Sequence, residues 1–273
     1  MKQTILEKKD YLPFTVFVCG LVLLSAWFFI ADRPDALGSD LENEVLPEKV
    51  VLPFEWGNLG RALVEAGVID ETKLDVSRYL EDEGVKAMVM TKENSGMWLN
   101  LLWAFGLANK NPILEQGPMA EYGDTGNFAS TGGWTIAKGG AMAHYSKYEF
   151  VVLNEAQQAL VERVSQGIFR PCCNNPTYFP DCNHGMAMLA LLELMAASNV
   201  SEDEMYEVAL EVNSYWFPGT YLTIAKYYEM KGIPWDRVDA REALGPNFSS
   251  ASGYAKVLNE VEPVNLQGGG CGL

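Results

Sequence analysis

The sequence predicts a mainly α-helical domain that follows a single N-terminal membrane-spanning helix. Three observations favour this fold class. Residues 14–31 form an uncharged apolar run, helix-capping signals recur from Asn154 onward, and strand signals are few, near Val50 and Val151. The chain has 273 residues, of which 48% are hydrophobic and 21% charged, and this balance suits a folded protein with a substantial core.

The run over residues 14–31 is near the lower limit of about 17–25 apolar residues for a membrane-spanning helix. An uncleaved signal anchor is favoured over a cleaved signal peptide, because the run exceeds the usual signal core of about 7–15 residues. Phe29 also replaces the small residue expected at the obvious cleavage site. A soluble buried helix is the remaining alternative.

Charge predicts the orientation of this anchor. Three lysines precede the run, and mostly acidic residues follow it. The positive-inside rule therefore predicts a cytoplasmic tail over residues 1–13. The chain from residue 32 onward is then extracytoplasmic, which means periplasmic or extracellular.

The first half of the exported part has mixed signals. Residues 32–53 are acidic, contain three prolines and lack periodicity, so we expect a linker, followed by the domain over 54–273. Short helices are predicted over 58–66 and 71–80. Residues 97–108 are almost all apolar but too few to cross a bilayer, which indicates a buried core helix.

Residues 112–140 are rich in glycine, with seven between Gly117 and Gly140. We expect a long loop here, and loops of this length are usually functional or disordered. A phosphate-binding loop is disfavoured, because no lysine follows as in a P-loop and no strand clearly precedes it.

The clearest helix signals lie in residues 141–262. Asn154 with Gln157, and Ser201 with Glu204, have the spacing of helix-capping boxes. The aromatic residues between 206 and 228 are interpreted as core residues and not as a sugar-binding face. The predicted helices cover residues 156–169, 184–197, 201–212, 220–231 and 251–260.

The net charge limits the class of partner. Acidic residues outnumber basic ones by 36 to 20, for a formal charge of −16. A nucleic-acid partner is therefore excluded, because such proteins need a basic face to neutralise phosphates. The predicted partners are the membrane, through the N-terminal helix, and a protein outside the cytoplasm.

One segment contains a cluster of metal-binding residue types. Cys172, Cys173 and Cys182 are followed by His184 and Met188, which are four residues apart and share a helix face. Thiolate, thioether and imidazole together favour Cu(I), zinc or an iron–sulfur cluster. Methionine favours copper, because zinc prefers cysteine, histidine and carboxylate. We therefore predict a soft-metal site, with copper as the ion, for storage, delivery or electron transfer.

Two more distant residues extend this hypothesis. His144 is the only other histidine, and Cys271 lies in the C-terminal tail. Both complete the ligand shell if the fold brings them near. A metal site that includes His144 requires it to lie within about one side-chain length of His184.

A disulfide-stapled binding or structural module is the first alternative. Exported proteins with an even number of cysteines usually form disulfides. A bond between Cys172 and Cys182 would close a short loop, and one between Cys173 and Cys271 would fix the tail. The glycine-rich segment 112–140 would then present the recognition surface.

A thiol enzyme is the second alternative, so the sequence leaves open whether the protein is an enzyme. Cys182 precedes a predicted helix, and the N-terminus of a helix lowers the pKa of a thiol and makes it nucleophilic. His184 or His144 would serve as its base.

Overall fold

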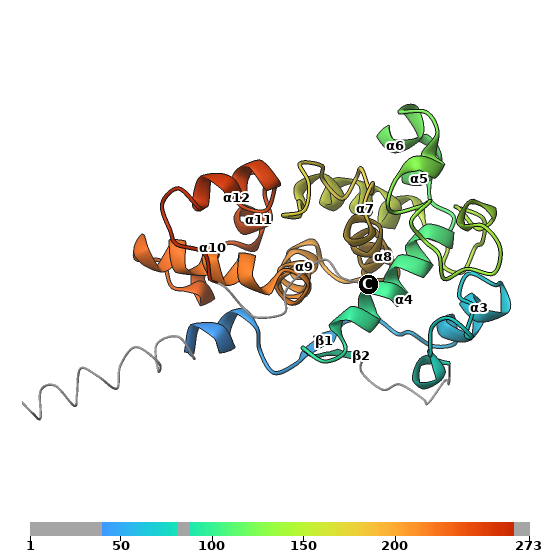
Figure 1. Cartoon of the computed structure of the whole chain (residues 1–273), viewed down its shortest axis with the longest axis horizontal. Coiled ribbons are helices and arrows are strands. Elements are labelled where there is room, and N and C mark those ends of the chain that lie inside the picture. Colours follow the sequence, from blue (N-terminus) through green and yellow to red (C-terminus); the bar gives the residue numbers. More distant parts are fainter. Residues whose placement is uncertain (1–39, 81–87, 265–273) are drawn as a thin grey trace, which may run out of the picture. The chain divides into compact units, whose positions relative to one another are not determined.

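The computed structural model describes residues 40–80 and 88–264. The chain divides into two compact units, residues 1–42 and 43–273, and the second contains the helical fold (Figure 1). The predicted anchor over 14–31 and the tail cysteine Cys271 lie outside the described residues. In the described part of the chain, no helix is both long and apolar enough to cross a membrane, so the anchor stays a prediction.

The second unit is mainly helical, with one small sheet (Figure 1). In chain order its elements are β1 (Val50–Leu52), α3 (Leu59–Glu65), the 3-10 helix η1 (Ser77–Tyr79), β2 (Met88–Met90), α4 (Ser95–Ala108), α5 (Pro112–Gln116), α6 (Pro118–Glu121), η2 (Thr125–Asn127), η3 (Ala141–Ala143), α7 (Glu155–Gly167), α8 (Asn183–Ala197), α9 (Glu202–Trp216), α10 (Pro218–Met230), η4 (Trp235–Arg237), α11 (Ala240–Ala243) and α12 (Ala251–Val257).

The helices predicted in the second half are confirmed in kind and place. At the start of α7, the Asn154 side chain accepts a hydrogen bond from the Gln157 amide, and the Gln157 side chain accepts one from the Asn154 amide. Ser201 caps α9 in a similar way, by accepting from the Glu204 amide. The helix α9 runs four residues beyond the predicted end, because Asn213, Ser214 and Tyr215 are buried and continue the core-facing side.

The structure differs from the sequence analysis at three places. Part of the predicted linker is folded, since β1 pairs antiparallel with β2 and buries Val50 and Leu52. The helix predicted over 71–80 is reduced to η1, a single 3-10 turn. The strand signal near Val151 gives no strand, because the side chain of Asn109 satisfies both the amide and the carbonyl of Val151.

The glycine-rich segment 112–140 is packed and not a structureless loop. Pro112 and Pro118 start the short helices α5 and α6, at the first helical position where proline is tolerated. The side chains of Ile113 and Leu114 in α5 and of Met119 in α6 are buried. Trp134, later in the segment, is also buried. The apolar residues between the glycines therefore anchor the segment to the domain.

The helix α8 is the centre of the core and packs against α4, α7 and α9. Every residue from His184 to Ala196 is buried. A Cβ atom on Gly106 of α4 would lie 2.4 Å from the carbonyl oxygen of Met186, so only glycine allows the two helices to approach this closely. This packing fixes the N-terminal end of α8, where the cysteine cluster lies.

Candidate metal centre

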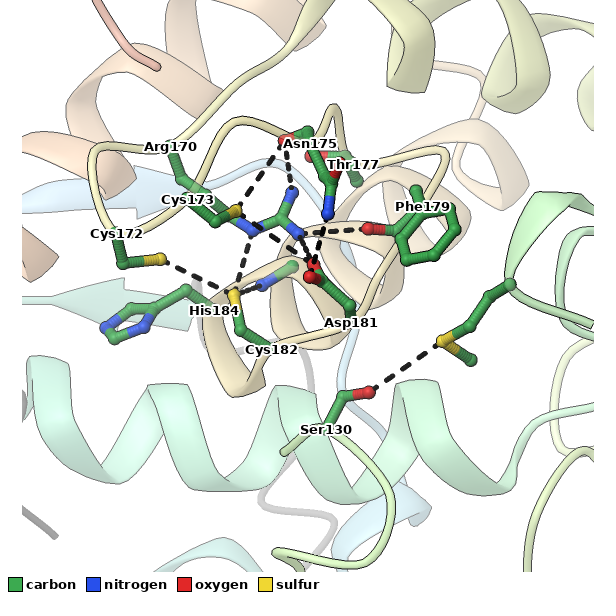
Figure 2. Close-up of polar contacts among 12 residues, drawn as sticks. Ser130, Arg170, Cys172, Cys173, Asn175, Thr177, Phe179, Asp181, Cys182 and His184 are labelled. Atoms are coloured by element: carbon green, nitrogen blue, oxygen red, sulfur yellow. Dashed lines mark hydrogen bonds and ion pairs between the residues drawn. The ribbon is translucent and has the colours of Figure 1, made fainter. Parts of the chain in front are cut away.

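Three cysteines meet where the loop over residues 168–182 enters α8 (Figure 2). Cys172, Cys173 and Cys182 are free thiols, and their sulfur atoms all lie within 4.8 Å of one another. Sulfur atoms that share one tetrahedral ion through bonds of about 2.3 Å lie about 3.8 Å apart. The cluster therefore has nearly the dimensions of a mononuclear thiolate site.

Backbone hydrogen bonds hold the loop 168–182 in place. The amide of Thr177 donates to the carbonyl of Ile168 at 2.8 Å, which closes the loop on itself. The amide of Ala251 donates to the carbonyl of Cys173 at 2.8 Å, which ties the loop to the start of α12. The positions of the cysteines therefore depend on contacts with distant parts of the domain.

A buried arginine, Arg170, contacts the cysteine cluster and the loop around it. The side chain of Arg170 is only 1% exposed, and its Nη2 contacts Asp181 Oδ1 at 2.6 Å. Its Nε donates to Cys182 Sγ at 2.9 Å, and its other nitrogens donate to the carbonyls of Asn175 and Phe179 (Figure 2). A buried guanidinium needs this set of acceptors to offset its lost hydration. Arg170 therefore places a positive charge directly against the sulfur atom of Cys182.

Gly185 makes room for this guanidinium. A Cβ atom at position 185 would lie 2.5 Å from both Cζ and Nη2 of Arg170. The guanidinium cannot shift away from such a Cβ atom without losing its hydrogen bonds to the loop carbonyls, Asp181 and Cys182. The glycine in the first turn of α8 is therefore a requirement of the site.

Cys182 is the N-cap residue of α8. Its Sγ accepts a hydrogen bond from the amide of Gly185 at 3.4 Å, in the place where serine or aspartate usually caps a helix. Hydrogen bonds with Cys172 and Cys173 lower the pKa of the Cys182 thiol well below its ordinary value, and His184 and Arg170 add to this against the effect of burial. Of the three thiols, Cys182 is therefore the one that loses its proton most readily.

The pKa values of the other two thiols shift in the opposite direction. Hydrogen bonds with Cys173 and Cys182, together with burial, raise the pKa of Cys172. A hydrogen bond with Cys172 lowers the pKa of Cys173, but the effects of Cys182 and burial outweigh it, so the pKa of Cys173 is also raised. A soft cation that replaced these protons would bind all three sulfur atoms.

His184 lies beside the cluster in the first turn of α8 and is 4% exposed. Its ring contacts Phe217 at a centroid distance of 4.4 Å and Trp216 at 5.8 Å. Its Nδ1 is buried and has no hydrogen-bond partner among the residues that the structure describes.

His144 is held elsewhere. Its Nδ1 is 2.9 Å from the hydroxyl of Tyr148, and its Nε2 is 3.0 Å from the carbonyl oxygen of Lys138. In the described part of the chain, the only group of three or more cysteine, histidine or acidic side chains with metal-site spacing is the three cysteines. The structure therefore gives His144 two protein partners, and it brings neither His144 nor His184 into the group of ligand atoms within 4.8 Å of one another.

The two remaining predicted ligands are Met188 and Cys271. Met188 is 1% exposed, within the α8 core, one turn after His184. Cys271 lies outside the described residues, so its participation stays a prediction, as does a bond to Cys173.

The sulfur atoms of Cys172 and Cys182 are 3.5 Å apart, compared with about 2.05 Å in a disulfide. The predicted bond between these two residues is therefore absent from this structure, and the stapled module has no support among the described cysteines. The distance still leaves the two sulfur atoms in contact.

The sequence analysis missed Arg170 and Gly185. Arg170 comes two residues before Cys172, and Asp181 directly precedes Cys182. Oppositely charged residues that flank a cysteine loop at both ends are the signal for an ion pair across its base. Nothing in the local sequence indicates that the arginine turns inward and lies against Gly185.

Comparisons with protein-family models, curated proteins and solved structures found no match to this chain.

Proposed function

We propose that this protein binds a soft metal ion through the thiolates of Cys172, Cys173 and Cys182, and that Cu(I) is its preferred ion. The observation that carries the proposal is the meeting of three free sulfur atoms within 4.8 Å of one another. A metal bridge explains why thiols from separate parts of a loop converge without forming a disulfide.

The donor set favours Cu(I). The group contains three sulfur atoms and no carboxylate among the described residues, and thiolates favour Cu(I), zinc and iron–sulfur clusters. Structural zinc is almost always four-coordinate, whereas this group supplies three ligands. The positive charge of Arg170, 2.9 Å from Cys182, offsets part of the negative charge of a trithiolate site.

The exposure of the site favours storage or delivery of the ion. Cys172 is exposed, while Cys173 and Cys182 are partly covered. An ion therefore has a path to solvent through Cys172, unlike an ion sealed in a core. Combined with the predicted anchor over 14–31, this exposure supports the proposal of a metal-exchanging site on the outer side of a membrane.

A copper titration tests the metal. The reduced full chain, in detergent and without oxygen, is titrated with Cu(I) against a chromophoric Cu(I) chelator. We expect one tightly bound Cu(I) per chain. Cys182→Ser keeps a good N-cap for α8 but removes a thiolate, so we expect its affinity to fall by at least about tenfold.

Cys19→Ser is the matched control, because it removes a thiol of the predicted anchor and leaves the cluster intact. Its Cu(I) affinity should equal that of the wild type. Failure of the wild-type chain to compete with the chelator would overturn the proposal, and so would equal affinities for wild type and Cys182→Ser.

The predicted location has its own test. Intact cells that produce the full chain are treated first with a membrane-impermeant metal chelator, which removes a bound ion from exposed thiols, and then with a membrane-impermeant maleimide. Labelled peptides are identified by mass spectrometry. We expect Cys172 to be labelled in intact cells. Labelling only after the cells are lysed would place the domain on the cytoplasmic side.

Thiol–disulfide exchange is a second candidate, favoured by the contact between the sulfur atoms of Cys172 and Cys182 at 3.5 Å. In this reaction the two thiols form a disulfide and lose two protons and two electrons to a partner disulfide, which is reduced to two thiols. In the reverse direction an incoming thiolate attacks exposed Cys172, and Cys182 leaves as a stabilised thiolate. Mass spectrometry of the metal-free chain in glutathione redox buffers tests this, and the absence of a Cys172–Cys182 bond under oxidising conditions excludes it.

A further inference from the structure

The buried Nδ1 of His184 is an unexplained polar atom at the edge of the cysteine cluster. Buried polar groups almost always have a hydrogen-bond partner, and an exception in a native site commonly marks a missing water or ion. The His184 side chain is nearly all buried, and no described residue bonds to this nitrogen. The group of ligand atoms within 4.8 Å of one another contains the three sulfur atoms and no nitrogen of His184. An ion that binds both therefore has to draw the cysteine loop and the imidazole closer together.

The surroundings of His184 fix the ring at the cluster. Trp216 and Phe217 contact the ring at the end of α9 and restrict its rotation. Phe217 has no polar side-chain atom, and the indole N–H of Trp216 donates to the carbonyl of Ser95. The His184 side chain makes a hydrogen bond with the Cys182 thiol, and both are labelled in Figure 2. The ring is therefore held within the polar end of α8 and cannot turn to bulk solvent.

We propose that His184 is the fourth ligand of this site, which completes a donor set of three sulfur atoms and one nitrogen. The inference rests on the thiolate site proposed above and extends the class of ion that it takes. Three cysteines and one histidine form a known tetrahedral set for zinc. With His184 bound, the site accepts a four-coordinate divalent ion, whereas Cu(I) needs only the three thiolates.

His184 thus determines which ion the site holds. Loss of the imidazole reduces a four-coordinate site to three ligands, which penalises Zn2+ and Co2+. The same loss leaves the three sulfur atoms available for Cu(I). Divalent ions should therefore be much more sensitive to His184 than Cu(I) is.

Co2+ and Zn2+ are the probes for this proposal. The reduced full chain is titrated with Co2+, and thiolate-to-cobalt charge-transfer and tetrahedral d–d absorption bands are recorded. Zn2+ affinity is measured by competition with a chromophoric chelator. His184→Phe keeps an aromatic ring against Trp216 and Phe217 but removes both nitrogens, and His184→Asn is a second, smaller variant in case the larger ring disturbs packing.

We expect the wild-type chain to show both sets of bands. In both His184 variants the tetrahedral bands should be lost or shifted, and Zn2+ affinity should fall by at least about tenfold, as even outer-shell changes weaken metal sites by 10–100-fold. The fall in Cu(I) affinity should be smaller. His144→Phe is the matched control and should bind Zn2+ and Co2+ as the wild type does.

The outcomes separate this inference from the proposed function. If the wild type shows no thiolate-to-cobalt bands and binds neither Zn2+ nor Cu(I), the thiolate site itself is wrong. If the wild type binds these ions and both His184 variants match it in Co2+ spectrum and Zn2+ affinity, only the role of His184 is overturned.

Discussion

The two histidines of this protein lie in two regions that use a buried imidazole in opposite ways. His144 and His184 are 6% and 4% exposed, and each contacts aromatic rings. Both ring nitrogens of His144 have a hydrogen-bond partner, in Tyr148 and in the backbone of Lys138. The Nδ1 of His184 has none among the described residues.

The comparison shows that burial alone does not identify a ligand. His144 has the contacts of a structural residue, because the fold satisfies its polar atoms and leaves no position for an ion. The Nδ1 of His184 lacks a partner among the described residues although the ring is as buried as that of His144, and His184 lies near the Cys182 thiol instead of a hydroxyl and a carbonyl. The two histidines are therefore distinguished by the hydrogen-bond partners of their ring nitrogens and not by their burial.

Replacing Arg170, the buried cation near His184, should lower the free energy of unfolding more than the other single substitutions proposed below. Arg170→Met leaves Asp181 and the Cys182 thiolate without their counter-charge, and the loss of one partner of a buried ion pair costs about 3–5 kcal/mol. Urea unfolding of the full chain measures this loss. Arg163→Met is the control, because the pair of Arg163 with Glu202 is exposed and should contribute less than about 1 kcal/mol.

Substitutions of the two histidines should lower the free energy of unfolding of the metal-free protein by different amounts. His144→Phe breaks two hydrogen bonds of a buried ring and should lower the free energy of unfolding by about 1–3 kcal/mol. His184→Phe removes an unpartnered nitrogen and should cost less. A larger loss for His184→Phe than for His144→Phe in urea would show that His184 has a structural partner and would break the comparison.

Substitution of Gly185, which contacts the Arg170 guanidinium, should lower the free energy of unfolding by an amount comparable to that of His144→Phe. Gly185→Ala places a methyl group 2.5 Å from the guanidinium of Arg170, and such overpacking costs about 1–3 kcal/mol. Gly96→Ala, in the first turn of α4, meets nothing within 4 Å and should be neutral or slightly stabilising. Thermal unfolding of both variants tests this, and equal melting temperatures would contradict the close contact at Gly185.

A second buried polar group of α8 predicts a pH dependence of the stability. Glu193 is completely buried, and its Oε2 accepts a hydrogen bond from Asn109 at 2.6 Å. Burial raises the pKa of Glu193 to about 8, against the opposing effect of hydrogen bonds from Asn109 and Asn111. The carboxyl group therefore favours its protonated form in the folded protein near neutral pH.

The sign of the pH dependence follows from this shift. The folded-state pKa of Glu193 lies above its unfolded value, so its contribution is complete below the unfolded pKa and is lost as pH rises through about 8. The loss amounts to at most about 1.4 kcal/mol per pH unit. Glu193→Gln should remove this slope in urea unfolding between about pH 5 and about pH 9, and an unchanged slope would contradict the assignment.

Much of the fold was predictable from local signals. Asn154 and Ser201 mark helix starts, as their capping-box spacing predicts. These signals act within one or two turns of the chain, so the sequence alone reveals them. The pairing of β1 with β2 was not predictable, because it joins residues about forty positions apart whose pattern is short.

The candidate site was predictable in composition but not in arrangement. The three cysteines and His184 are recognisable from residue type and spacing. The inward turn of Arg170 depends on Gly185 and on carbonyls of the loop, and the exclusion of His144 depends on Tyr148 and Lys138. Such contacts are tertiary, and no local pattern encodes them.

Cysteine protection by a bound metal tests the central claim most directly. The full chain is purified without chelators under reducing, oxygen-free conditions, its metal content is measured, and iodoacetamide labelling of each cysteine is followed by mass spectrometry before and after metal removal. The account predicts one metal ion per chain, with Cys172, Cys173 and Cys182 protected together and all three exposed to alkylation once the ion is removed. A chain that binds no added Cu(I) or Zn2+, and whose three cysteines react at the same rates with and without these ions, would contradict it.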